Sequence, residues 1–219
     1  MLLQQILNGL LIGGIYALVA VGFALIYSIM RYTNFSHGAE IMVGAYIGYS
    51  VITKFHLSLI PGIILAFIGA ALVNIIVERI GFYPIRIKKA PGIFTLVSSL
   101  VVAMLLQNLI LVIFGPGFQV LPQLVNTIPI ITKPVFVSRL DFYILIITLL
   151  SLIVFNLIVY RTKVGLAMRA TSCNQKAAFL MGVNIDQISM IAFALAGALA
   201  GISGILLGMK YSEIGRAHV

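Results

Sequence analysis

The chain has 219 residues, of which 62% are hydrophobic and only 9% are charged. A soluble domain averages about a quarter charged residues, so this composition excludes an ordinary soluble fold. The apolar runs are long and continuous, whereas a membrane β-barrel would alternate apolar and polar residues. We therefore expect an all-α, polytopic membrane protein with about six spans.

The formal net charge of +9 is unevenly distributed along the chain. Eight of the fourteen Lys and Arg residues fall in residues 79–89 and 161–176, and apolar runs flank both segments. Cytoplasmic loops of membrane proteins carry such an excess of cations, so both segments are expected inside the cell. The positive charge therefore reflects membrane topology, and we expect no nucleic-acid partner.

The residues that usually carry chemistry are few. Cys173 is the single cysteine, so no intramolecular disulfide can form, and the three histidines (His37, His56 and His218) are scattered, which argues against a zinc cluster. No Gly-x4-Gly-Lys-Ser/Thr phosphate loop, Gly-x-Ser-x-Gly or His-Glu-x-x-His motif occurs. We expect no catalytic residue, no metal and no cofactor.

Six apolar stretches are predicted as membrane spans, at residues 3–30, 41–53, 59–77, 94–114, 142–160 and 188–208. The second is too short to cross alone, because a crossing needs about 20 residues. It can cross only if part of the polar patch at residues 33–40 lies within the membrane. Strict alternation places the amino terminus and the proline-rich segment 115–140 outside.

Glycines recur at a four-residue spacing in the first and last spans. Small residues at this spacing allow neighbouring helices to approach closely. The predicted helix-packing positions are Gly9, Gly13, Gly197, Gly201, Gly204 and Gly208.

The polar patch before the second span contains Asn34, Ser36, His37, Gly38 and Glu40. One interpretation is a solvated loop in which Ser36 caps the following helix. The other is a broken helix, whose positive N-terminal end meets a carboxylate substrate within the membrane, as in several transporters. Glu40 suits the helix dipole but repels an anion, and the residues alone leave both interpretations open.

The second basic segment contains a short predicted helix. Ser172 and Gln175 have the spacing of a capping box, and Gly182 can close the helix in a left-handed conformation. Its apolar surface comprises Ala177, Ala178, Phe179 and Met181. A plain tether needs no such surface, so we expect a helix that docks a soluble partner.

Four stretches together resemble the permease subunits of bacterial branched-chain amino-acid ABC importers, and among them the high-affinity H-type subunit. These stretches are residues 5–18, 34–46, 169–184 and 194–204. The resemblance implies a permease domain at residues 1–212 that is incomplete at its C-terminus. Residues 213–219 break the hydropathy pattern, and we expect them to be a non-native tail.

The resemblance also implies partners and a location. A second homologous permease, two cytoplasmic ATPase subunits and a periplasmic binding protein for leucine, isoleucine or valine would complete an importer in the bacterial inner membrane. ATP hydrolysis would then belong to the partners. The implied coupling residues are Arg169, Ser172, Ala177, Ala178 and Gly182.

One coupling position departs from the pattern, because Lys176 stands where related permeases often have an acid. Alternative functions also remain. Sister ABC permeases carry urea or short amides, other amino acids or simple sugars. A membrane scaffold without a path is a different class of protein, and an ion-coupled transporter would need an intramembrane acid, for which Glu40 is the candidate.

Overall fold

The computed structural model describes residues 2–122, 129–131 and 137–214, and these residues are mostly helical. In chain order the helical elements are α1 (Leu2–Met30), α2 (His37–Lys54), α3 (Leu59–Val77), a π-helical turn η1 (Glu78–Phe82), α4 (Tyr83–Ile87), α5 (Gly92–Phe114), α6 (Arg139–Arg161), α7 (Lys163–Cys173), α8 (Gln175–Leu180) and α9 (Ile185–Tyr211). Four short strands pair antiparallel, β1 (Gln119–Val120) with β4 (Glu213–Ile214) and β2 (Pro129–Ile131) with β3 (Val137–Ser138). The predicted all-α fold class is confirmed.

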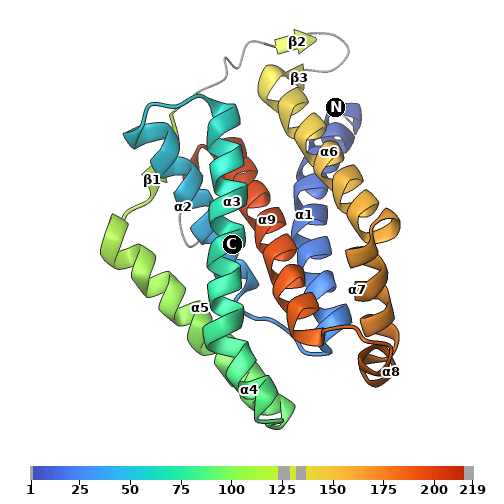
Figure 1. The fold of residues 1–219 in the computed structure, drawn as a ribbon. Helices are drawn as coiled ribbons and strands as arrows, with labels where there is room; N and C mark the ends of the chain where they lie inside the picture. Colours follow the sequence, from blue (N-terminus) through green and yellow to red (C-terminus); the bar gives the residue numbers. More distant parts are fainter. Residues whose placement is uncertain (1, 123–128, 132–136, 215–219) are drawn as a thin grey trace.

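Five helices of the described chain are long and apolar enough to cross a membrane. They are Leu2–Met30, Leu59–Ile87, Gly92–Phe114, Arg139–Arg161 and Ile185–Tyr211. The remaining predicted span, at residues 41–53, forms part of α2, which is not one of these five. Short helices α4, α7 and α8 share one end of the bundle, here called the basic end, and the amino terminus lies at the other (Figure 1).

Helix α2 begins part of the way through the bundle. Its first residue, His37, contacts the backbone of Val19 in α1. At 1.5 Å per residue, Val19 lies about 16 Å along the axis from the end of α1 at the basic end. The polar patch before α2 therefore lies part of the way along α1, away from the basic end of the bundle.

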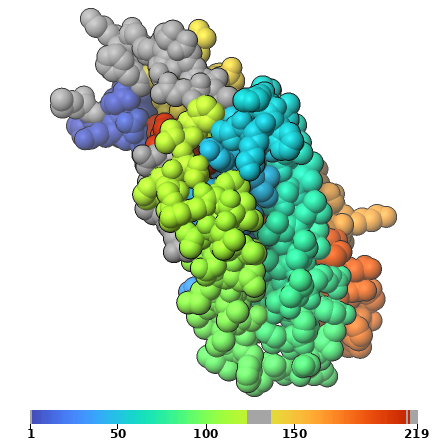
Figure 2. Space-filling model, turned by 90° about the vertical axis from the view of Figure 1, so that its left-hand side faces the viewer, coloured from blue at the N-terminus to red at the C-terminus, as the bar shows by residue number. Residues whose placement is uncertain are grey.

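Helix α9 is the central helix and packs against α1, α2 and α3 (Figure 1). In α9, 78% of the apolar window is buried, against 11% in α5 and 11% in α6. The outer helices α5 and α6 therefore expose most of their apolar surface. Figure 2 shows one such side, formed by α5 and by α3 with its extension α4.

Small residues in α9 explain why it can be so fully surrounded. A Cβ atom at Gly201 would lie 2.4 Å from the carbonyl oxygen of Ala66, and one at Gly204 would lie 2.3 Å from that of Ile41. Gly197 lies equally close to α3, and Gly208 lies against Ile214. These backbones touch because no side chain separates them.

The two predicted packing glycines of α1 differ, because a Cβ atom at Gly9 or at Gly13 would meet no described atom within 4 Å. Both residues are exposed on this chain. Their predicted role in helix packing is not realised among the described residues and stays a prediction.

The basic end is fastened by a buried ionic cluster. Arg86 in α4 lies 2.8 Å from the fully buried Glu78 carboxylate of η1 and 2.9 Å from Asp186 in α9. Its Nη1 also donates to Ser189 at 2.8 Å, and Ser189 donates to Glu78 at 3.0 Å. The start of α9 is therefore held firmly to η1 and α4.

Gly201→Ala tests the close packing of α9. The added methyl group clashes with α3, so we expect a loss of roughly 1–3 kcal/mol in the free energy of unfolding. Gly92→Ala is the matched control, since a Cβ there would meet open space. Thermal unfolding in detergent measures both, and equal stability of the two variants would contradict the packing.

Candidate functional site

The polar patch folds into a cage around Glu40, which is 1% exposed. Its Oε1 accepts hydrogen bonds from Asn34 Nδ2 at 3.1 Å and from Ser36 Oγ at 2.7 Å. Its Oε2 lies 3.0 Å from Nδ1 of His37. Asn74 of α3, with its amide turned to donate, brings Nδ2 to 2.9 Å from the same Oε2. Four side chains from two segments therefore surround one carboxylate.

This cage decides between the two interpretations of the patch. Ser36 precedes α2 but makes no capping hydrogen bond, so the interpretation of Ser36 as a simple cap is wrong. The helix begins part of the way along the bundle, and its first turn already contains the carboxylate of Glu40. The positive end of the helix dipole thus faces an anion from its own chain.

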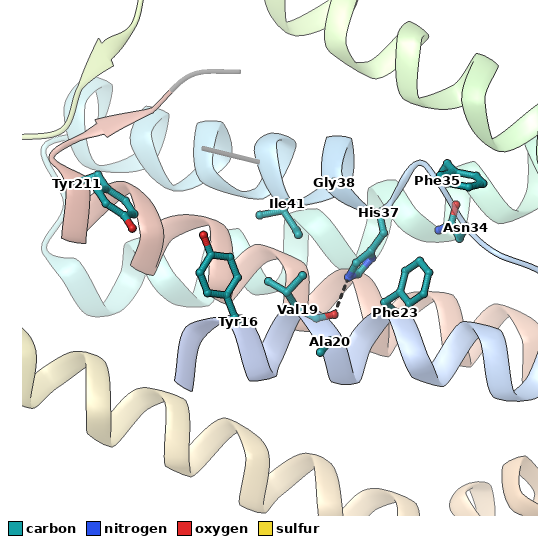
Figure 3. Close-up of a pocket in the computed structure, with 10 residues that line it drawn as sticks. All are labelled: Tyr16, Val19, Ala20, Phe23, Asn34, Phe35, His37, Gly38, Ile41 and Tyr211. Atoms are coloured by element: carbon teal, nitrogen blue, oxygen red, sulfur yellow. Dashed lines mark hydrogen bonds between the residues drawn. The ribbon is translucent and has the colours of Figure 1, made fainter. Parts of the chain in front are cut away.

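His37 connects the cage to α1. Its Nε2 lies 3.2 Å from the carbonyl oxygen of Val19 (Figure 3). Gly22 makes room for the ring, because a Cβ atom there would lie 3.1 Å from His37 Cε1. The imidazole therefore bridges α1 and α2 at the level of the cage.

A groove of about 890 Å³ opens beside His37, between α1 and α2 (Figure 3). Its lining residues are Tyr16, Val19, Ala20, Phe23, Asn34, Phe35, His37, Gly38, Ile41 and Tyr211. Aromatic and aliphatic walls with a few polar groups are typical of a small-molecule site. Of the five predicted path residues, Asn34, His37 and Gly38 line the groove. Ser36 and Glu40 do not line it, but lie behind the residues that do.

The aromatic walls were not predicted from the sequence. Tyr16, Ala20 and Phe23 lie on one stripe of α1 at helical spacing, a signal that is hard to separate from ordinary core residues. Tyr211 comes from the far end of α9, so only the tertiary structure brings it to the groove. Among the described residues, no group of three or more His, Cys, Asp or Glu could hold a metal ion.

The predicted docking helix is α8, and its start differs from the prediction. Asn174 caps it by accepting from the backbone N–H of Ala177 at 3.1 Å. Gln175 instead donates to the carbonyl oxygen of Ile29 in α1 at 2.6 Å. The predicted capping box of Ser172 and Gln175 is therefore wrong, because the nearer asparagine takes the cap and the glutamine has a tertiary partner.

The end of α8 is a glycine turn, as the sequence indicated. Gly182 has φ of +86°, its N–H donates to Phe179, and Val183 N–H donates to Ala178. These two bonds form the Schellman arrangement that closes helices at a left-handed residue.

The exposed surface of α8 also differs from expectation. Ala178 is only 4% exposed, so it faces the bundle. The next three residues, Phe179, Leu180 and Met181, are 67%, 83% and 85% exposed and form an apolar patch at the basic end. We call these three residues the α8 patch.

Arg169, the other implied coupling residue, bonds within the chain. Its guanidinium donates to the carbonyl oxygen of Val159 and lies 5.2 Å from the ring centre of Tyr160. Arg169 therefore fixes α7 to the end of α6. Lys176, which departs from the family pattern, is exposed beside the α8 patch.

A bundle of apolar helices long enough to cross a membrane, with a groove that has polar groups part of the way along it, is the architecture of a polytopic membrane permease. The chain belongs to the family described as the permease component of branched-chain amino acid transport systems, which matches residues 5–215. It is accordingly a multi-pass inner-membrane protein. No solved structure matches the chain.

Relatives of this chain carry consistent names. The high-affinity branched-chain amino acid transport system permease protein LivH of Salmonella typhimurium is 30% identical, covering 97% of this chain and 72% of its own length. The protein BraD of Pseudomonas aeruginosa, named for the same system, has the same identity and coverage. A probable branched-chain amino acid permease of Methanocaldococcus jannaschii is 29% identical over 93% of this chain and 66% of its own length.

Substitutions of Glu40 test the cage. Glu40→Ala leaves several buried donors without an acceptor, and we expect the free energy of unfolding to fall by about 3 kcal/mol. Glu40→Gln keeps the shape and one acceptor oxygen, so it should lose less. Thermal unfolding in detergent distinguishes the two, and a Glu40→Ala protein as stable as the parent would refute the cage as a structural anchor.

Proposed function

We propose that this chain is the membrane-spanning permease subunit of an ATP-driven importer of branched-chain amino acids. Similarity to permeases named for that substrate class, extending over almost the whole chain, carries the proposal. The groove is chemically suitable, because aromatic walls can accept an aliphatic side chain while Asn34 and His37 offer polar groups.

The groove is half of the proposed path. Its walls at Tyr16 and Phe35 are 51% and 49% exposed, so the groove opens on the side of the bundle. A groove with polar groups at membrane depth is poorly matched to lipid, since unsatisfied polar groups are costly there. A second, homologous permease facing α1 would enclose it and supply the other half.

The exposed stripe of α1 is suited to that partner. Gly9, Gly13, Tyr16, Ala20 and Tyr27 follow one another at three-, four- and seven-residue intervals and are all exposed. Two small residues four apart permit close approach of another helix, and the tyrosines add contact area and polar hydroxyls. We therefore assign this stripe to the second permease.

Gly13→Ile tests the stripe. A bulky residue there meets open space within the chain but blocks a close helix from outside, so we expect roughly tenfold less second permease to co-purify. Gly92→Ile, also in open space on another helix, is the control and should leave pairing unchanged. Equal co-purification of the two variants would remove α1 from the interface.

The α8 patch is the proposed docking surface for the ATPase subunits. It is apolar, lies at the basic end and carries the exposed Lys176 beside it. The positive-inside rule places that end in the cytoplasm, where ATP is available. The sequence has no phosphate-binding loop of its own, so a partner would supply the energy.

Uptake of labelled leucine into vesicles that carry the complete complex tests the function. We expect ATP-dependent uptake that unlabelled isoleucine and valine reduce and that urea or simple sugars do not. Leu180→Asp should lower uptake roughly tenfold or more, because it places an unpaired carboxylate in an apolar interface. Leu166→Asp, at an exposed leucine of α7, is the matched control.

The competition pattern distinguishes the alternatives. Uptake that sugars or urea reduce, and branched-chain amino acids do not, would assign the chain to a sister importer. Leucine uptake without ATP would favour ion-coupled transport. Normal uptake with Leu180→Asp would separate the α8 patch from ATPase docking.

A further inference from the structure

Two hydrogen bonds join the proposed docking segment to the end of α1. The guanidinium of Arg31 donates to the carbonyl oxygen of Ser172 at the end of α7. In the reverse direction, Gln175 at the start of α8 donates to the carbonyl oxygen of Ile29 at 2.6 Å. We call these four residues the α1–α8 clamp. Each side thus contributes one side chain and one backbone carbonyl.

The clamp sits on tightly packed apolar residues. Met168 of α7 is 2% exposed and belongs to the same buried cluster as Ile26, Ile29 and Met30 of α1. Packed interiors transmit displacement because they have few voids to absorb it. Movement of α7 and α8 would therefore carry the end of α1 with it.

The chain leads directly from the clamp to the groove. Arg31 has φ of 61°, which turns the backbone sharply out of α1. Tyr32 follows and stacks on Phe82 at a ring-centre distance of 5.4 Å. Asn34, two residues later, lines the groove and donates to Glu40. Three residues of extended chain span at most about 10 Å, so little slack separates the clamp from the cage.

Movement of α8 could also reach the groove through α9, but the start of α9 is bound to other elements. Its first turns are bound to η1 and α4 through Asp186 and Ser189, which both contact Arg86. These bonds hold α9 to the bundle at the point where it leaves α8. The end of α1 bonds directly to the docking segment and continues into the groove.

We propose that Arg31 and Gln175 are positioning residues that couple movement of α8 to the groove through the end of α1. This inference rests on the proposed function, since it requires ATPases that act on α8. The clamp has two bonds at separate points, Ser172 and Gln175, so moving the two segments apart requires breaking both. The loop 31–36 then repositions Asn34 and the start of α2.

The test uses the complete complex with Gln175→Met and Arg31→Ala. We expect leucine uptake per ATP hydrolysed to fall roughly tenfold in each, the size of a lost coupling interaction. Co-purification of the ATPases should stay unchanged, because neither residue belongs to the α8 patch. Arg31→Lys retains the positive charge and should recover part of the uptake. Lys163→Ala, which removes an exposed cation of α7, is the matched control.

Three outcomes separate this inference from the proposed function. Absence of ATP-dependent uptake in the parent complex would refute the proposed function itself. Parent uptake with both variants equal to Lys163→Ala would overturn the coupling role alone. Loss of ATPase co-purification in the variants would also overturn it, because the residues would then serve docking.

A crosslink decides the question if Arg31→Ala does not insert. Arg31→Cys can be joined to the native Cys173, beside Ser172, with a reversible bifunctional thiol reagent. We expect Arg31→Cys to lower uptake per ATP hydrolysed and crosslinking to restore it, since the covalent link replaces the lost bond of the clamp, and reduction should lower it again. The same variant with Cys173→Ser should not respond. Uptake that stays low in the crosslinked complex would overturn the proposal.

Discussion

The burial of one carboxylate among apolar helices constrains much of this structure. Glu40 is costly to place there, and the cost is offset only if donors surround it. Those donors are Asn34 and Ser36 from the preceding loop, His37 from the first turn of α2, and Asn74 from α3. Meeting this requirement fixes where α2 starts, how the loop from α1 returns into the bundle, and which side of His37 faces the groove.

The sequence predicted what depends on local composition. Apolar runs identified the five helices that are long enough to cross a membrane, and clustered cations identified one end of the bundle. Tertiary contacts decided the rest. Asn174 and Ser172 are both good caps, and only the contact of Gln175 with Ile29 selects between them. Ala178 resembles its exposed neighbours in sequence, yet it faces the bundle.

The basic end and the centre of the bundle are built differently. At the basic end, polar side chains bind across helices, as in the cluster of Arg86 and in the α1–α8 clamp. Along the centre of the bundle, backbones touch at glycines and leave no side chain to rearrange. A rigid centre and a hydrogen-bonded basic end favour movement of whole helices along their axes over bending of single helices. The peripheral helices α5 and α6 have few such contacts.

The π-helical turn Glu78–Phe82 has a consequence for comparing this chain with its relatives. A π-turn places one extra residue within a helix that otherwise continues from α3 into α4. One residue corresponds to about 100° of rotation around the helix axis. A relative with one residue fewer at this point would direct the equivalent of Arg86 away from Asp186 and Ser189. A single-residue gap in an alignment at this turn therefore indicates that the contacts of Arg86 at the basic end differ in that relative.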